Sequence, residues 1–140
     1  MKKKYTKGLF ILLIVIIISW LLKDTFSQPN AADLDGGFTE KASYRNENNT
    51  GPVQHIYSVS VKNPANANFE AYGSLMPHHK YGNTKVYFFK AGEPIPIKLY
   101  PGNINFDAIY EPNCIALYEK SAMGNSAVTL SPFIQKLKTP

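Results

Sequence analysis

The chain has 140 residues, a formal net charge of +5 and a single cysteine, Cys114. This length allows one domain behind a short leader. One cysteine excludes an intramolecular disulfide and any zinc or iron–sulfur site built from cysteines. The charge is unevenly placed, because residues 33–140 carry ten Lys or Arg and nine Asp or Glu. A nearly neutral domain lacks the basic surface that binds phosphate backbones, so we expect no nucleic-acid partner.

An apolar run near the start is the clearest feature of the sequence. Residues 9–22 contain no charge, and twelve of the fourteen are Leu, Ile, Val or Phe. At about 0.3 to 0.6 kcal/mol for each of these twelve, transfer of the run into a bilayer is favourable by roughly 4 to 7 kcal/mol. We therefore expect membrane lipid around a helix whose anchoring residues include Leu9, Phe10, Ile14, Ile18, Trp20 and Leu22.

The residues after this run favour a retained anchor over a cleaved leader. Signal peptidase requires small residues at the first and third positions before its cut. A cut after Ala31 would put Pro29 at the third position, and a cut after Ala32 would put Asn30 there. The sequence TFS would permit a cut before Gln28, but it matches the preferred A-x-A pattern poorly. We expect residues 9–22 to stay as a transmembrane anchor or uncleaved signal, and a cleaved leader is the alternative.

Lysines indicate the orientation of this anchor. Only Lys23 closely follows the apolar run, whereas four lysines precede it: Lys2, Lys3, Lys4 and Lys7. By the positive-inside rule, residues 1–8 stay in the cytoplasm and the bulk of the chain is exported. The Lys-, Asn- and Ile-rich composition suggests a bacterial protein. We therefore expect a single pass through the inner (cytoplasmic) membrane, with an extracytoplasmic or periplasmic domain.

The exported part divides by composition. Residues 23–52 are polar and rich in Gly, Asn, Asp and Ser, which predicts a linker with one short strand near Phe38–Tyr44. The β domain is expected over residues 53–134, and residues 135–140 form a short polar tail.

Short strands separated by turn residues predict the fold class. In VQHIYSVSVK the apolar residues alternate from Val53 to Val61, as in a half-buried strand. Further strands are expected in FEAYGSL, KVYFFK, PIKLY, INFDAIY, CIALYEK and AVTLSPF. Asn113 is also a candidate cap for a helix over residues 114–123, but strand-like neighbours favour a strand there. The pattern predicts an all-β fold, a small antiparallel sandwich or barrel-like domain.

Residues suited to catalysis or metal binding are sparse. His78 and His79 are adjacent, and adjacent residues of an extended chain point to opposite sides, so they rarely bind one metal ion. A two-histidine site would need His55, or a carboxylate, from another strand. We therefore expect no catalytic residue, cofactor or metal. A small hydrolase would require Glu93, Asp107 and His55 to meet within about 5–8 Å in a pocket.

Aromatic residues are the strongest pointer to a binding function. Residues 33–140 contain eight Tyr and six Phe. Several tyrosines alternate onto the face opposite the apolar residues of their predicted strand, and the expected partner face consists of Tyr72, Tyr87, Tyr100 and Tyr118. Such a face stacks on sugars or docks a protein. Cross-strand stabilisation of an ordinary sheet would account for the same residues.

Together these features predict a membrane-anchored extracytoplasmic β domain that serves as a non-catalytic binding or accessory subunit of a bacterial envelope complex. Its expected partners are membrane lipid, through the N-terminal helix, and a protein of the envelope. A cleaved, secreted β-sandwich that binds carbohydrate is the main alternative. The small hydrolase is the second alternative.

Overall fold

The computed structural model describes residues 2–26 and 30–134. It divides into two compact units, Met1–Asn30 and Ala31–Pro140. The first unit is the helix α1, Lys2–Phe26. Within it, Tyr5–Lys23 is long and apolar enough to cross a membrane, a property that anchors share with signal sequences. The expected anchoring residues are all exposed on this helix: Leu9, Phe10, Ile14, Ile18, Trp20 and Leu22. The predicted tail, 135–140, lies outside the described residues.

The second unit is built on one five-stranded sheet in the order β1-β2-β3-β4-β5. Its strands are β1 Phe38–Arg45, β2 Gln54–Val61, β3 Asn83–Lys90, β4 Cys114–Lys120 and β5 Ser126–Leu130. β2 and β3 are parallel, and the other neighbours are antiparallel. Every strand overlaps a segment expected to be extended, and the strand over CIALYEK is confirmed against the helix alternative.

The segment FEAYGSL is a helix, so the strand predicted there is wrong. It forms α2, Phe69–Leu75, and the side chain of Asn68 caps its start by accepting the Ala71 N–H at 3.0 Å. Gly73 faces β4, and a Cβ at this position would overlap the ring of Tyr118. The glycine therefore allows α2 to approach the sheet closely. Among residues 30–134 the second unit also has three short 3-10 helices: Ala31–Asp33, Pro64–Asn66 and Ala108–Asn113.

The expected antiparallel sandwich or barrel is wrong, although the sheet dominates the domain as predicted. Between β2 and β3 the chain passes through α2, which allows the two strands to run in the same direction. Parallel neighbours need such a crossover, whereas antiparallel neighbours are joined by short hairpins. The result is one mixed sheet rather than two packed antiparallel sheets.

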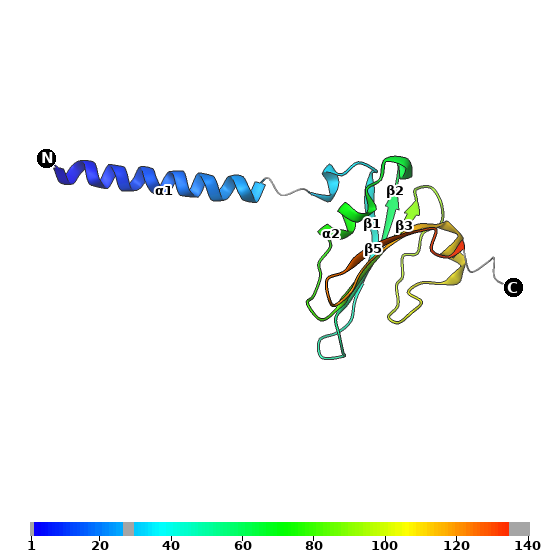
Figure 1. The fold of residues 1–140 in the computed structure, drawn as a ribbon. Coiled ribbons are helices and arrows are strands. Elements are labelled where there is room, and N and C mark those ends of the chain that lie inside the picture. Colours follow the sequence, from blue (N-terminus) through cyan, green and yellow to red (C-terminus); the bar gives the residue numbers. More distant parts are fainter. Residues whose placement is uncertain (1, 27–29, 135–140) are drawn as a thin grey trace. The chain divides into compact units, whose positions relative to one another are not determined.

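Both faces of the sheet are covered. Figure 1 shows α2 on one side and the segment between β3 and β4, residues 91–113, on the other. We call residues 91–113 the covering segment. The core under α2 consists of Tyr57, Val59, Val61, Tyr72, Val86, Phe88, Ala116 and Tyr118. The core under the covering segment consists of Ile56, Tyr87, Phe89, Leu99, Phe106, Cys114 and Leu117.

Two further strand predictions, both within the covering segment, are wrong. PIKLY and INFDAIY do not form strands, and the segment has irregular structure apart from one 3-10 helix. Prolines at positions 94, 96 and 101 have no N–H to give to a sheet ladder, which explains why this stretch stays outside the sheet.

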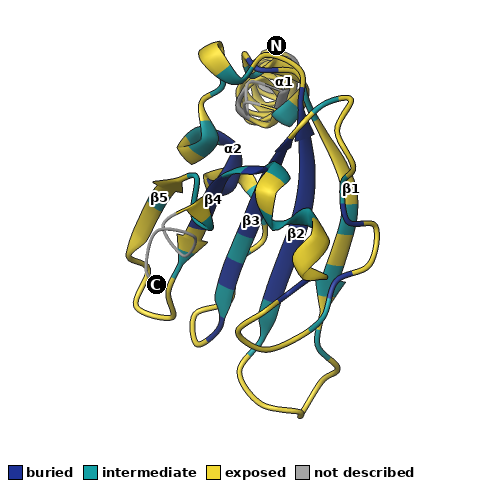
Figure 2. Cartoon of the chain, turned by 90° about the vertical axis from the view of Figure 1, so that its right-hand side faces the viewer, coloured by how far each residue is buried: buried dark blue, intermediate teal, exposed yellow. Residues whose placement is uncertain are grey.

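The same segment explains why β2 is buried on both faces instead of one. Residues 55–61 are all buried, as Figure 2 shows along the length of β2. The polar side chains expected to face solvent point toward protein groups instead. Ser58 donates a hydrogen bond to the Pro96 carbonyl at 2.9 Å, so its buried hydroxyl has a partner. Buried hydroxyls are tolerated when they are paired in this way.

Candidate functional site

The covering segment is the strongest candidate for a functional site. Loops of this length without strands are uncommon in compact domains and frequently carry a function. Leu99 and Phe106 hold the segment to the sheet, with exposed fractions of 8% and 3%. Phe106 packs edge-on against Tyr87 and Phe89, with ring centroids 4.8 and 5.4 Å apart. These contacts fix the backbone of the segment at several separate points.

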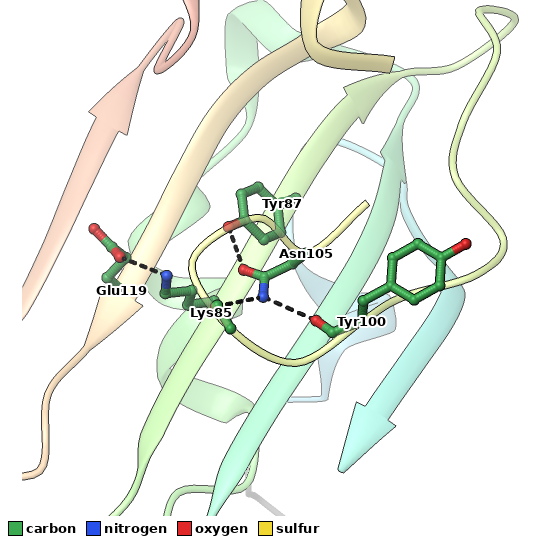
Figure 3. A network of polar contacts seen from close by, with 6 residues as sticks. Lys85, Tyr87, Tyr100, Asn105 and Glu119 are labelled. Carbon is green, nitrogen blue, oxygen red and sulfur yellow. Dashed lines mark hydrogen bonds and ion pairs between the residues drawn. The ribbon is translucent and has the colours of Figure 1, made fainter. Parts of the chain in front are cut away.

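A buried asparagine closes the central turn of the segment (Figure 3). The Asn105 side-chain nitrogen donates to the carbonyl oxygens of Tyr100 and Gly102, both at 2.9 Å. Its side-chain oxygen accepts the hydroxyl of Tyr87 at 2.6 Å. The Tyr100 N–H in turn donates to the Asn105 carbonyl at 2.8 Å. A single side chain thereby ties the turn to itself and to β3.

Tyr87 is the fixed end of this network. Burial raises the pKa of its hydroxyl, and Glu119 raises it further. The hydroxyl therefore stays protonated and remains a donor to Asn105. Glu119 itself forms an ion pair with Lys85, with Nζ and Oε1 3.6 Å apart, beside Tyr87 in Figure 3.

Three isoleucines of the covering segment face solvent. Ile97, Ile104 and Ile109 are 79%, 63% and 74% exposed. Their exposure follows from the packing of their neighbours, because Pro96, Leu99, Asn105 and Phe106 turn inward and leave them outward. Single exposed apolar side chains are common, and the occurrence of three on one firmly held segment makes this segment our candidate for an interaction surface.

A pocket adjoins this segment at Pro101. It has a volume of about 520 Å³, and Tyr44, Arg45 and Gln54 contribute to its walls. The loop on its other side is ordered by Asn46, whose side-chain oxygen accepts the Gln54 N–H at 2.8 Å. The pocket therefore lies between two loops that are each held by an asparagine.

The expected tyrosine face does not exist as an exposed surface. Tyr72 of α2 and Tyr118 of β4 are buried between the helix and the sheet, and Tyr87 is buried under the covering segment, on the opposite side of the sheet. Only Tyr100 reaches solvent in part, and the Lys98 ammonium lies 5.6 Å from its ring centroid. The prediction assumed strands with one solvent-exposed face. It fails because Tyr72 lies on a helix and because the central strands are covered on both faces.

All three histidines lie near one another, a proximity that the sequence alone did not reveal. His55 is buried on β2, and its ring centroid is 6.3 Å from that of exposed His79. Burial lowers the pKa of His55, and Arg45 lowers it further. His78 Nδ1 lies 3.0 Å from Thr84 Oγ1, whose hydroxyl donates to the Pro77 carbonyl. Within residues 2–26 and 30–134, no group of three or more His, Cys, Asp or Glu is placed to hold a metal ion.

The carboxylates proposed for a hydrolase do not lie in a sheltered cleft. Glu93 and Asp107 are both exposed on the covering segment, whereas His55 is buried on β2. General acid–base catalysis needs such groups within hydrogen-bond reach of the same reacting atoms in one site. Burial raises the pKa of the Cys114 thiol to about 12.

No family model, curated protein or solved structure matches this chain significantly. The features described here define its class as a sheet-dominated domain that follows an apolar N-terminal helix.

Proposed function

We propose that the protein is a single-pass inner-membrane protein of a bacterial envelope, and that its exported domain is a non-catalytic binding or accessory subunit. The domain docks an envelope protein through Ile97, Ile104 and Ile109 of the covering segment. The exposure of these three side chains on an otherwise fixed segment is the observation that carries the proposal. The apolar helix α1 supports the membrane location.

Burial of the isoleucines supplies a sufficient driving force. Covering one such side chain is worth about 1.5–3 kcal/mol, so three give on the order of 5–9 kcal/mol before the costs of association. The Asn105 network reduces one of these costs, because a segment that is already ordered loses little entropy on binding.

The surroundings of the isoleucines favour a protein ligand over a sugar. Exposed Glu93, Lys98 and Asp107 supply mixed charges on the same segment, as in the polar rim of a protein interface. A sugar-binding face would need exposed aromatic rings. Three of the four tyrosines expected to provide them are buried.

Photo-crosslinking in native membranes tests the docking surface. A photo-reactive amino acid is placed at Ile97 or Ile104 of the full-length protein, and at Met123 as a control. Met123 is also apolar and is 88% exposed, but it lies in the β4–β5 turn. We expect one defined protein adduct from the two isoleucine positions and little from Met123. Equal labelling at all three positions, or no protein adduct, would contradict the proposal.

The membrane location requires a separate measurement. We expect a protein of full mass in washed membranes, resistant to extraction by carbonate. An extracytoplasmic protease added to spheroplasts should remove the domain and leave residues 1–8 protected. Recovery of a soluble mature form that begins beyond residue 24 would overturn the anchor, while leaving the docking surface to be judged by crosslinking.

A further inference from the structure

Within residues 2–26 and 30–134 no strand pairs with the outer edge of β5, so its backbone groups are available there. Next to this strand, the Ser121 N–H donates to the Asn125 carbonyl and the Ser131 N–H donates to the Ile115 carbonyl, both at 2.9 Å. Odd-numbered residues of this stretch therefore direct their backbone groups toward β4. Since direction alternates along a strand, Ser126, Val128 and Leu130 direct theirs away from β4. The edge thus offers three N–H and three C=O groups.

β5 is the shortest strand of the sheet, but it lacks three other features that normally prevent an edge from pairing. Its sequence, SAVTL, contains no charge and no proline, and its register with β4 has no bulge. The opposite edge of the sheet, β1, differs on each point except proline. It has a register shift between Glu40 and Ala42 and carries exposed Glu40, Lys41 and Arg45. Charged side chains and bulges are the usual means by which sheets block edge-to-edge association.

The apolar side chains of β5 are also only partly packed. Val128 packs in part against the core under α2, whereas Leu130 on the same face is 66% exposed. A neighbouring strand on this side would cover Leu130 and complete the burial of Val128. Figure 2 shows that β5, at one edge of the sheet, consists mainly of exposed residues.

We infer that β5 pairs with β5 of a second copy of this chain, antiparallel about a two-fold axis through Val128. The outward groups are symmetric about this residue, so the arrangement places Ser126 opposite Leu130 of the second copy and uses all six groups on each strand. The absence of charge means that self-pairing brings no like charges together. Two copies in one membrane would also meet at a raised effective concentration.

Disulfide formation tests the pairing and its register. In this arrangement Ala127 lies opposite Thr129 of the second copy, at a position without hydrogen bonds, where Cα atoms are about 4.5 Å apart. That separation suits a disulfide. Full-length Ala127→Cys and Thr129→Cys chains carrying different tags are co-expressed and oxidised in membranes. We expect severalfold more mixed dimer than same-variant dimer, because identical positions are offset along the strands.

A matched control uses the other edge. Lys41→Cys and Ser43→Cys chains, exposed on β1, should give only background dimer under the same oxidation. The native Cys114 is buried and does not contribute. A second test uses variants that block the edge. Leu130→Pro removes only an outward N–H, and Leu130→Lys adds an edge charge. Both should shift the detergent-solubilised protein to monomer mass, whereas Met123→Lys should not.

The outcomes separate the candidate occupants of the edge. Mixed disulfides together with a dimer mass that Leu130→Lys abolishes support pairing between two copies. A disulfide from Ala127→Cys or Thr129→Cys to a different protein would overturn the second copy and assign the edge to a foreign strand. A monomeric protein without mixed disulfides overturns pairing altogether. If Leu130→Pro unfolds, as judged by its melting curve, the result with Leu130→Lys decides.

Discussion

The two faces of the sheet are closed in different ways. One face is covered by α2, a helix that pairs its own backbone groups and packs aromatic side chains onto the strands. The other is covered by residues 91–113, an irregular segment that must satisfy its backbone with side chains such as Asn105. An irregular covering segment needs polar side chains that pair its backbone groups, but it can leave apolar residues exposed to solvent. The helix face is therefore suited to stability and the irregular face to recognition.

The largest effect should come from the helix-covered face. Phe88 is fully buried and packs against Phe38, Phe69 and Tyr72. Phe88→Ala should lower the free energy of unfolding by about 3–5 kcal/mol, through lost burial and a cavity. Chemical denaturation measures the change. The exposed Ile109→Ala is the control and should be nearly neutral, and a similar loss from both variants would contradict the packing described.

An intermediate effect on stability is expected at Asn105, whose side chain holds the turn of the covering segment. Asn105→Ala leaves the Tyr87 hydroxyl and two carbonyls without their partner. The buried Tyr87 hydroxyl left unpaired costs about 1–3 kcal/mol, and the two carbonyls, which are only partly buried, add less, so the total should lie near 2–4 kcal/mol. Asn113→Ala is the matched control, since it removes one exposed hydrogen bond to the Pro94 carbonyl. Equal melting shifts would show that Asn105 does not fix the segment.

Partner binding should sharpen this contrast between the faces. If Asn105 orders the docking surface, Asn105→Ala should also reduce photo-crosslinking from Ile97 at temperatures where the domain remains folded. Phe88→Ala should not do so while folded, because its contacts lie on the other side of the sheet.

A smaller effect should follow from acidification. The folded pKa of His55 lies below its unfolded value of 6.5, because of burial and the nearby Arg45, with His79 and His78 adding to the shift. The unfolded state therefore binds more protons as the pH falls through 6.5, and stability decreases toward the folded pKa. Melting curves at pH 7.5 and 5.5 should show this loss for the native protein. It should be weaker in His55→Gln, with His78, whose pKa is also lowered, supplying part of the remainder.

The smallest effect is expected for the exposed ion pair. Lys85→Met and Glu119→Gln remove a contact whose side chains are 20% and 47% exposed. Such pairs contribute about 0–1 kcal/mol, less at high salt. Denaturation in low and high salt should therefore give a small difference that salt reduces further. A loss of unfolding free energy comparable to that of Asn105→Ala would contradict the minor role given to this ion pair.

Strand positions were largely predictable from the sequence, because alternation and β-branched residues mark them locally. The coverings of the sheet were harder to predict. FEAYGSL looks extended when its apolar residues are counted in steps of two, yet the Asn68 cap and the close approach at Gly73 favour a helix. PIKLY and INFDAIY have strand-like composition, but Pro96 in the first, Pro101 between the two and the tertiary role of Asn105 in the second keep them irregular.

The candidate site was less predictable than the strands. Exposure of Ile97, Ile104 and Ile109 depends on which neighbouring residues turn toward the sheet. The sequence alone does not show which residues do so. One signal was available: these isoleucines lie in a stretch that also contains several prolines and glycines, where a continuous strand is unfavourable. The apolar helix, by contrast, follows directly from composition and needs no tertiary information.

Cys114 gives this molecule an internal reporter. Its side chain is 3% exposed, and its raised pKa keeps the reactive thiolate scarce. An alkylating reagent can therefore reach the sulfur mainly when β4 separates from its coverings. The labelling rate in living cells would then count spontaneous openings of the domain, and a bound partner that holds the fold closed would slow it.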